Sequence, residues 1–161
     1  MKTLLFGGAC SVGKTEAIIR LTKKLMDNGF SVATGEFPPS NPNHKDIRLV
    51  LSGTDNAGET IAIYINSATD STNIIYDAKR FLDNVGTVNF IISSVRDYDF
   101  WPRKDFFQIM GIDPSSSDVF EIPLAKVTRR SDSFDVALSW YEATLDKLVE
   151  KIIREQPFNF I

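Results

Sequence analysis

Residues 8–15 constrain this chain more than any other segment. They read Gly-Ala-Cys-Ser-Val-Gly-Lys-Thr and match the pattern G-x-x-x-x-G-K-[ST] at its fixed positions, Gly8, Gly13, Lys14 and Thr15. Glycines let the backbone curl so that several N–H groups point toward one anion. The start of a helix after the turn adds free N–H donors and a positive dipole end. The pattern therefore predicts an anion-binding turn.

The flanking sequence supplies the context that such a turn requires. Residues 3–6 form a short apolar run that is typical of a buried strand. Residues 16–28 carry apolar side chains at helical spacing, and Gly29 stands where a helix C-terminal cap is expected. Strand, glycine-rich turn and helix thus follow one another in the expected order.

On these residues the chain resembles the P-loop NTPases, in which this octapeptide is the Walker A motif. The specific resemblance covers residues 3–28 and is architectural beyond them. It implies that the turn binds the phosphates of ATP together with Mg²⁺. Lys14 would then contact the β- and γ-phosphates, and Thr15 would offer its hydroxyl to the metal. The residues implied to bind ATP are Gly8, Ala9, Cys10, Ser11, Val12, Gly13, Lys14 and Thr15.

Composition narrows the class of protein further. The 161 residues are 43% hydrophobic and 24% charged, which indicates a single globular domain over residues 1–161. The formal net charge is −3 and the basic residues are dispersed, so we expect no nucleic-acid partner. No apolar run is long enough to cross a bilayer, so we expect no membrane association. Cys10 is the single cysteine, which fits a cytoplasmic protein; it is either a small filler or a redox-sensitive thiol.

Hydrophobic periodicity predicts an alternation of strands and helices. The order indicates an α/β fold, a three-layer sandwich around a mostly parallel sheet, and the resemblance implies that this fold is of the P-loop NTPase type. The segment 47–66 reads as a hairpin, so one of its arms must be antiparallel, and the apolar arm 60–66 belongs in the middle of the sheet. The strands are predicted at 3–6, 30–34, 47–52, 60–66, 88–93 and 119–124, and the helices at 16–28, 72–84, 102–110 and 134–155.

Polar residues follow the predicted strands, at the sheet edge where ligands bind in α/β proteins. Asp70 comes after a strongly apolar strand, and the family resemblance implies a Walker B aspartate that holds Mg²⁺. Alternatively, Asp70 or Ser71 simply caps the next helix. The metal ligands are therefore predicted to be Thr15 and Asp70. The catalytic residues are predicted to be Lys14, Asp70, Arg96 and Arg103. Other polar residues after the strands are Asn66, Ser67, Thr69, Ser93, Ser94 and Lys126.

Residues 96–104 occupy the position of a lid in small P-loop kinases. This implies that Arg96 and Arg103 close over the phosphates and neutralise the charge that moves during transfer. Arg129 and Arg130 are an alternative source of such an arginine, or else are solvated charges. Three aromatic side chains of the same segment either pack into the protein or stack on a ligand: Tyr98, Phe100 and Trp101.

Two further segments are predicted without a fixed role. Residues 37–46 are rich in Pro, Asn and Ser and read as a surface loop that helps to bind an acceptor. His44, in that loop, reads more readily as a solvated side chain than as a catalyst. The apolar tail 157–161 docks either on the body of the protein or on a second subunit.

Three functions remain open from the sequence. The first is Mg²⁺-dependent phosphoryl transfer from ATP to a small acceptor, as in a small P-loop kinase. The second is ATP hydrolysis or a nucleotide switch that acts on a protein partner. The third is a nucleotide-binding module without turnover. Adenine is preferred to guanine because residues 94–97 match the guanine-reading motif Asn-Lys-x-Asp poorly.

Overall fold

Strands and helices alternate along the chain as the periodicity predicts. This computed structural model describes residues 1–40, 45–128 and 133–161, which contain six strands and four helices. The predicted ends differ from the observed ends by no more than two residues. The strands are β1 (Lys2–Gly7), β2 (Ser31–Gly35), β3 (Arg48–Thr54), β4 (Thr60–Asn66), β5 (Phe90–Val95) and β6 (Val119–Pro123). The helices are α1 (Lys14–Asp27), α2 (Thr72–Val85), α3 (Trp101–Met110) and α4 (Phe134–Arg154).

The strands form one mixed sheet in the order β2-β3-β4-β5-β1-β6. Neighbours from β4 to β6 pair in parallel, whereas β3 pairs antiparallel with β2 on one side and with β4 on the other. The α/β class is therefore confirmed, and so is the interior place of β4. The prediction of a mostly parallel sheet was too strong, because the reversed strand β3 lies between two neighbours and makes that half of the sheet antiparallel.

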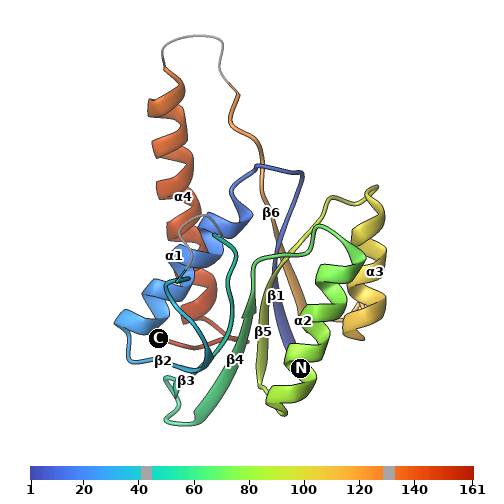
Figure 1. The fold of residues 1–161 in the computed structure, drawn as a ribbon. Helices are drawn as coiled ribbons and strands as arrows, with labels where there is room; N and C mark the ends of the chain where they lie inside the picture. The colour runs from blue at the N-terminus through green and yellow to red at the C-terminus, as the bar shows by residue number, and fades with distance from the viewer. Residues whose placement is uncertain (41–44, 129–132) are drawn as a thin grey trace.

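Helices cover both faces of this sheet, with α1 and α4 on one face and α2 and α3 on the other (Figure 1). Side chains of successive strand residues point to opposite faces. In β4, Ile63 and Ile65 accordingly join the apolar cluster under α1 and α4, while Tyr64 joins the cluster under α2 and α3. Both faces of β4 are therefore covered by helices, which explains why β4 is apolar at nearly every position.

The inward faces of two helices differ in detail from the predicted ones. The apolar spacing of residues 134–155 predicts an inward stripe of Phe134, Leu138, Tyr141, Leu145, Leu148 and Ile152. In α4 the buried residues are instead Leu145, Val149 and Ile153, and Leu148 is exposed. The N-terminal half of α4 extends past the edge of the sheet (Figure 1), so the apolar Phe134 near its start is 41% exposed. The apolar spacing of residues 72–84 predicts that Ile74, Ala78, Phe81 and Leu82 face inward. In α2 the buried residues are Ile75, Ala78 and Leu82, while Ile74 is only partly buried.

The apolar tail docks on the body of the protein. Phe158 and Phe160 are each 1% exposed and pack edge-on or tilted against Phe90, with Phe30 and Phe120 alongside. The tail therefore closes the core beneath α1 and α4.

Among the described helices, none combines the length and the apolar character that crossing a membrane requires.

Candidate functional site

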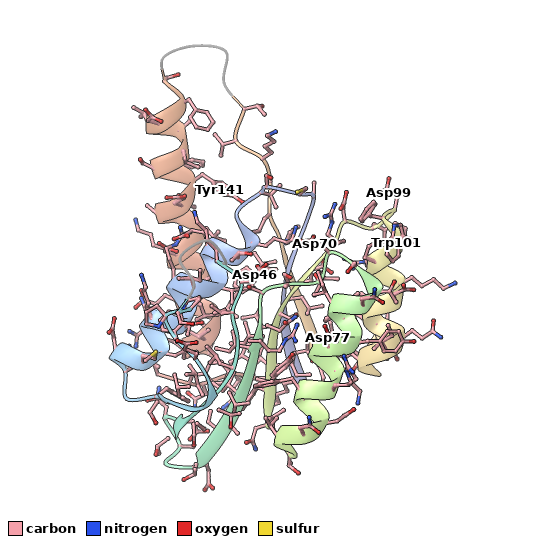
Figure 2. The ribbon with its side chains drawn as sticks, viewed as in Figure 1. Asp46, Asp70, Asp77, Asp99, Trp101 and Tyr141 are labelled. Atoms are coloured by element: carbon pink, nitrogen blue, oxygen red, sulfur yellow. The ribbon has the colours of Figure 1, made fainter. Side chains whose placement is uncertain are left out.

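The parallel strands β1, β4, β5 and β6 end at the same edge of the sheet, and the candidate site is built there. The segments that follow them are the 8–15 loop, residues 67–70, the residues from Arg96 onward and the residues from Leu124 onward. Asp46 and Asp70 both lie at this edge, above the strand ends (Figure 2). Residues from four separate parts of the chain are thereby brought together.

The 8–15 loop depends on backbone conformations that favour glycine. Gly8 has φ +143° and Gly13 has φ +88°, while Ser11 adopts φ +60°. A Cβ atom on Gly8 would lie 2.8 Å from the carbonyl oxygen of Leu124, so a larger residue would collide with the backbone after β6. Helix α1 begins directly at Lys14, with the N–H of Ala17 donating to the carbonyl of Gly13 at 2.9 Å. The loop is therefore a tight turn at the N-terminus of α1.

Lys14 is folded into this loop and is only 9% exposed. Its Nζ donates to the carbonyl oxygens of Gly8 at 2.8 Å and Ala9 at 2.6 Å. Burial lowers the pKa of Lys14 below its ordinary value, and the nearby positive charge of Arg96 lowers the pKa further. The loop thus holds a partly desolvated cation at its centre, whose present partners are neutral carbonyl groups.

A cavity of about 440 Å³ opens beside Lys14 and is called the Thr15 cavity here. Predicted site residues on its wall include Lys14, Thr15 and Asp70. The side chains and backbone that line it are Cys10, Ser11, Gly13, Lys14, Thr15, Glu16, Lys45, Asp46, Ser67 and Asp70. The sequence-predicted turn and the predicted carboxylate therefore face one polar space.

Asp46 is the site residue that sequence reasoning missed. It lies in the connection between β2 and β3, and its Oδ1 accepts hydrogen bonds from Thr15 Oγ1 at 3.2 Å and Ser67 Oγ at 3.1 Å. The sequence placed Asp46 only at the end of a surface loop. Its position directly before the buried Ile47, at the start of a strand, is the one signal that could have indicated a fixed carboxylate.

Asp70 lines the same cavity but is engaged elsewhere. Its Oδ1 accepts a hydrogen bond from Arg96 Nη1 at 2.8 Å, and its side chain is 61% exposed. Ser71, not Asp70, is the N-cap residue of α2, since its Oγ accepts from the N–H of Ile74 at 3.4 Å. Of the two alternatives for this segment, capping thus falls to Ser71, and Asp70 is free of that role.

Arg96 and Arg103 occupy different environments. Arg96 approaches the carboxylates of Asp70 and Asp97, and its guanidinium lies 4.3 Å from the centroid of the Phe100 ring. Hydrogen bonding to Asp70 raises the pKa of Arg96. This arginine is therefore close to the Thr15 cavity through its partner Asp70 and holds the end of β5 in place.

Arg103 forms a two-pronged pair with Glu121 of β6, with nitrogen–oxygen distances of 2.9 and 2.7 Å. It also donates to the carbonyl of Arg96 at 3.0 Å, and hydrogen bonding to Glu121 raises the pKa of Arg103. Arg103 does not line the Thr15 cavity. In this structure it connects α3 to the sheet.

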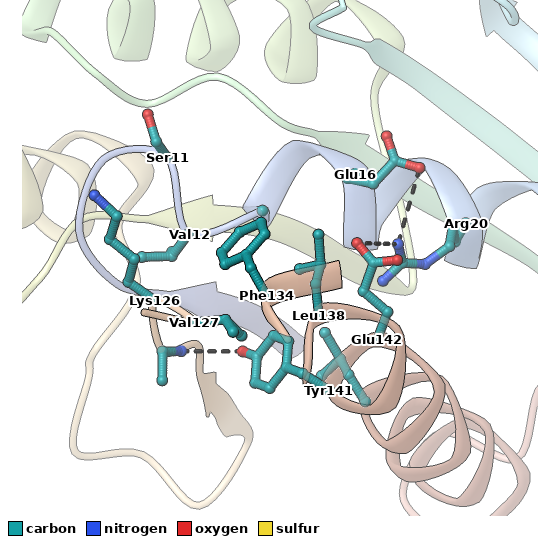
Figure 3. Close-up of a pocket in the computed structure, with 13 residues that line it drawn as sticks. Ser11, Val12, Glu16, Arg20, Lys126, Val127, Phe134, Leu138, Tyr141 and Glu142 are labelled. Carbon is teal, nitrogen blue, oxygen red and sulfur yellow. Dashed lines mark hydrogen bonds and ion pairs between the residues drawn. The ribbon is translucent and has the colours of Figure 1, made fainter. Parts of the chain in front are cut away.

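A second cavity of about 260 Å³ adjoins the 8–15 loop (Figure 3). We call it the Tyr141 cavity. Its wall includes Val12, Phe134, Leu138 and Tyr141, and Tyr141 accepts a hydrogen bond through its hydroxyl from the N–H of Ala125 at 3.0 Å. Ser11, Gly13 and Glu16 line both cavities, so the two spaces border the same part of the loop and of α1.

The remaining sequence candidates have the following positions. Cys10 is exposed, with its Sγ 3.5 Å from Ser11 Oγ. Tyr98 and Trp101 are exposed, so the predicted alternative in which they pack into the protein does not hold for these two residues. The Arg96 guanidinium covers one side of the Phe100 ring. His44, Arg129 and Arg130 lie outside the described residues.

Comparison with protein-family models, with curated proteins and with solved structures gave no match for this chain.

Proposed function

We propose that this chain is a P-loop NTPase-like protein that binds ATP and Mg²⁺ and transfers the γ-phosphoryl group to a small acceptor. The observation that carries the proposal is the buried Lys14 in a tight turn at the N-terminus of α1, beside a polar cavity. A helix N-terminus preceded by such a turn attracts anions through its free N–H groups. A desolvated lysine at its centre adds a full positive charge.

Phosphate binding would replace the carbonyl partners of Lys14 with charged oxygen atoms. The bonds from Lys14 to Gly8 and Ala9 are made to neutral carbonyl groups, whereas a phosphate oxygen would bring a negative charge to the ammonium group. Backbone N–H groups of the 8–15 loop surround the β-phosphate in this proposal. Lys14 then spans the β- and γ-phosphates, and Arg96 balances the charge as the γ-phosphoryl group moves. Phosphoryl transfer of this kind depends mainly on positioning and electrostatics.

The donor set at the Thr15 cavity suits Mg²⁺. This ion prefers oxygen ligands and is typically held in nucleotide sites by one or two protein groups plus phosphate oxygens and waters. Thr15 supplies a hydroxyl there, and Asp46 and Asp70 supply carboxylates on the same wall. When bound, Mg²⁺ neutralises the charge that develops on the β- and γ-phosphates.

The Tyr141 cavity supports a nucleotide as the ligand over a small inorganic anion. It adjoins the 8–15 loop and presents apolar and aromatic side chains, which suit the flat face of a base. The phosphates at the loop and a base in this cavity would belong to one ligand, because Ser11, Gly13 and Glu16 line both spaces. We propose adenine as the base.

Turnover measurements test the proposal. ATP consumption and product formation are followed with and without a panel of nucleosides, nucleotides and small metabolites. We expect ADP release that depends on Mg²⁺ and rises with one acceptor, together with a phosphorylated product. Slow release that no acceptor changes would instead indicate the hydrolase or switch. Binding without release would indicate a non-catalytic module.

A further inference from the structure

Two hydroxyl groups converge on one carboxylate oxygen at the edge of the Thr15 cavity. Thr15 Oγ1 donates to Asp46 Oδ1 at 3.2 Å, and Ser67 Oγ donates to the same oxygen at 3.1 Å. Thr15 lies in the first turn of α1, Asp46 precedes β3, and Ser67 follows β4. The arrangement joins three elements that are up to 52 positions apart in sequence at one point on the cavity wall.

The backbone at Asp46 is fixed although its side chain is exposed. The N–H of Ile47 donates to Ser67 Oγ at 2.9 Å, and the N–H of Ser67 donates to the carbonyl of Ile47 at 3.0 Å. The Ile47 side chain is 2% exposed and belongs to the core under α1 and α4. Asp46 is therefore anchored to the sheet through its neighbour, which pre-positions the carboxylate without help from a ligand.

Asp46 and Asp70 differ in how available their charge is. Asp70 is paired with Arg96 at 2.8 Å, so binding a cation would compete with that pair. Within the described part of the chain, no ion pair of a lysine or arginine involves Asp46. In addition, a hydroxyl group that donates a hydrogen bond to a carboxylate still has its oxygen lone pairs available to bind a cation. The Thr15 hydroxyl and the Asp46 carboxylate thus lie side by side on the wall of the Thr15 cavity, where both could bind one cation.

We infer that Asp46, rather than Asp70, is the carboxylate that works with Thr15 to hold the Mg²⁺ accompanying a bound triphosphate. The inference rests on the proposed function. Thr15 supplies the hydroxyl, Asp46 supplies the negative charge, and Ser67 is a positioning residue that orients Asp46. Asp70 then serves to hold Arg96 at the end of β5.

Calorimetric ATP binding with Mg²⁺ and with EDTA tests the inference without relying on turnover. The readout is the ratio of the two dissociation constants, which measures how much Mg²⁺ tightens binding. In Asp46→Asn we expect this ratio to fall by about tenfold or more, the size of effect seen when a group that supports a metal site is removed. The affinity of Asp46→Asn for ATP in EDTA should not fall, because the variant loses a negative charge that repels the phosphates.

Asp70→Asn is the direct comparison, since it removes the same charge from the same cavity. We expect the Mg²⁺ ratio to fall clearly less in Asp70→Asn than in Asp46→Asn. Ser67→Ala should lower the ratio in the same direction as Asp46→Asn but by less. Circular dichroism checks that each variant is folded. If Asp46→Asn does not fold, the Mg²⁺ ratio of Ser67→Ala against that of the wild-type protein decides the question.

Each other outcome overturns the inference. A wild-type ratio in Asp46→Asn would exclude a role for Asp46 in metal binding. Equal losses in Asp46→Asn and Asp70→Asn would show a general charge effect, and a loss in Asp70→Asn alone would return the role to Asp70. If the wild-type protein binds ATP in neither condition, the proposed function itself fails, and that result is distinct from the other three.

Discussion

At the scale of single residues, Lys14 is a cation in a position where water solvates it poorly. We predict that Lys14→Ala weakens ATP binding severely while the fold persists, because the loop carbonyls of Gly8 and Ala9 lose only a hydrogen-bond donor. Thermal denaturation with and without ATP measures this, since a ligand at a hundred times its Kd adds about 2.7 kcal/mol to the free energy of unfolding. Lys23→Ala, on the exposed face of α1, is the control and should keep the full shift. An unchanged shift in Lys14→Ala would contradict the assignment.

The lowered pKa of Lys14 predicts proton uptake on ATP binding. Burial and Arg96 disfavour the charged ammonium in the free protein, whereas a triphosphate beside it favours the charged form and raises its pKa. In alkaline buffers below the ordinary value of 10.5, the affinity for ATP should therefore fall as the pH rises. Calorimetry in two buffers of different ionisation enthalpy measures the protons taken up.

Lys14→Arg provides the comparison for that titration. A guanidinium stays protonated throughout this pH range, so any ATP binding that the variant retains should proceed without alkaline proton uptake. Uptake equal to that of the wild-type protein would assign the titration to a group other than Lys14.

At the scale of elements, Arg103 holds α3 to β6 through Glu121, while the sequence predicted that it closes over the phosphates. The Arg103 side chain is 17% exposed and the Glu121 side chain is 29% exposed, so most of each side chain is shielded from solvent. We predict that Arg103→Ala lowers the free energy of unfolding by about 1–3 kcal/mol, the usual range for removing a charged hydrogen-bond partner. The affinity for ATP should change less than about twofold, a difference below 0.5 kcal/mol.

Urea denaturation and ATP titration of the same samples measure both quantities. Lys104→Ala, an exposed change of equal charge on the same helix, should stay within about 0.5 kcal/mol of the wild-type stability. Weakened ATP binding with unchanged stability in Arg103→Ala would support the predicted lid instead.

Local patterns predicted elements well because their causes are local. The turn between β1 and α1 requires glycines at fixed positions, and the apolar spacing of α1 follows from one face packing on the sheet. Phe134 is exposed because the N-terminal half of α4 extends past the sheet, and no periodicity reports where a helix leaves the surface that it packs on. Asp46 was missed for a similar reason. Its partner Thr15 lies 31 positions away, and only the strand order brings the two together.

At the scale of the whole molecule, the two ends of the chain help to hold the site from below. The residues of β1 that lead into the 8–15 loop, Leu4 and Phe6, belong to the same apolar cluster as Phe158 and Phe160 of the tail. Lys2 also donates to the carbonyl of Pro157 at 3.0 Å. Since β1 carries the loop and the tail closes the core beneath it, loss of tail packing should loosen the site as well as the fold.

We therefore predict that Phe160→Ala lowers the free energy of unfolding by about 3–5 kcal/mol, as is typical for truncating a buried phenylalanine. The ring is 1% exposed and meets Phe90 at a centroid distance of 4.7 Å, so its removal leaves a cavity among aromatic neighbours. Urea denaturation measures the loss, with Phe134→Ala as the matched change at a ring that is 41% exposed. Equal stability losses in the two variants would show that the tail does not close the core, because only a buried ring leaves a void when it is truncated.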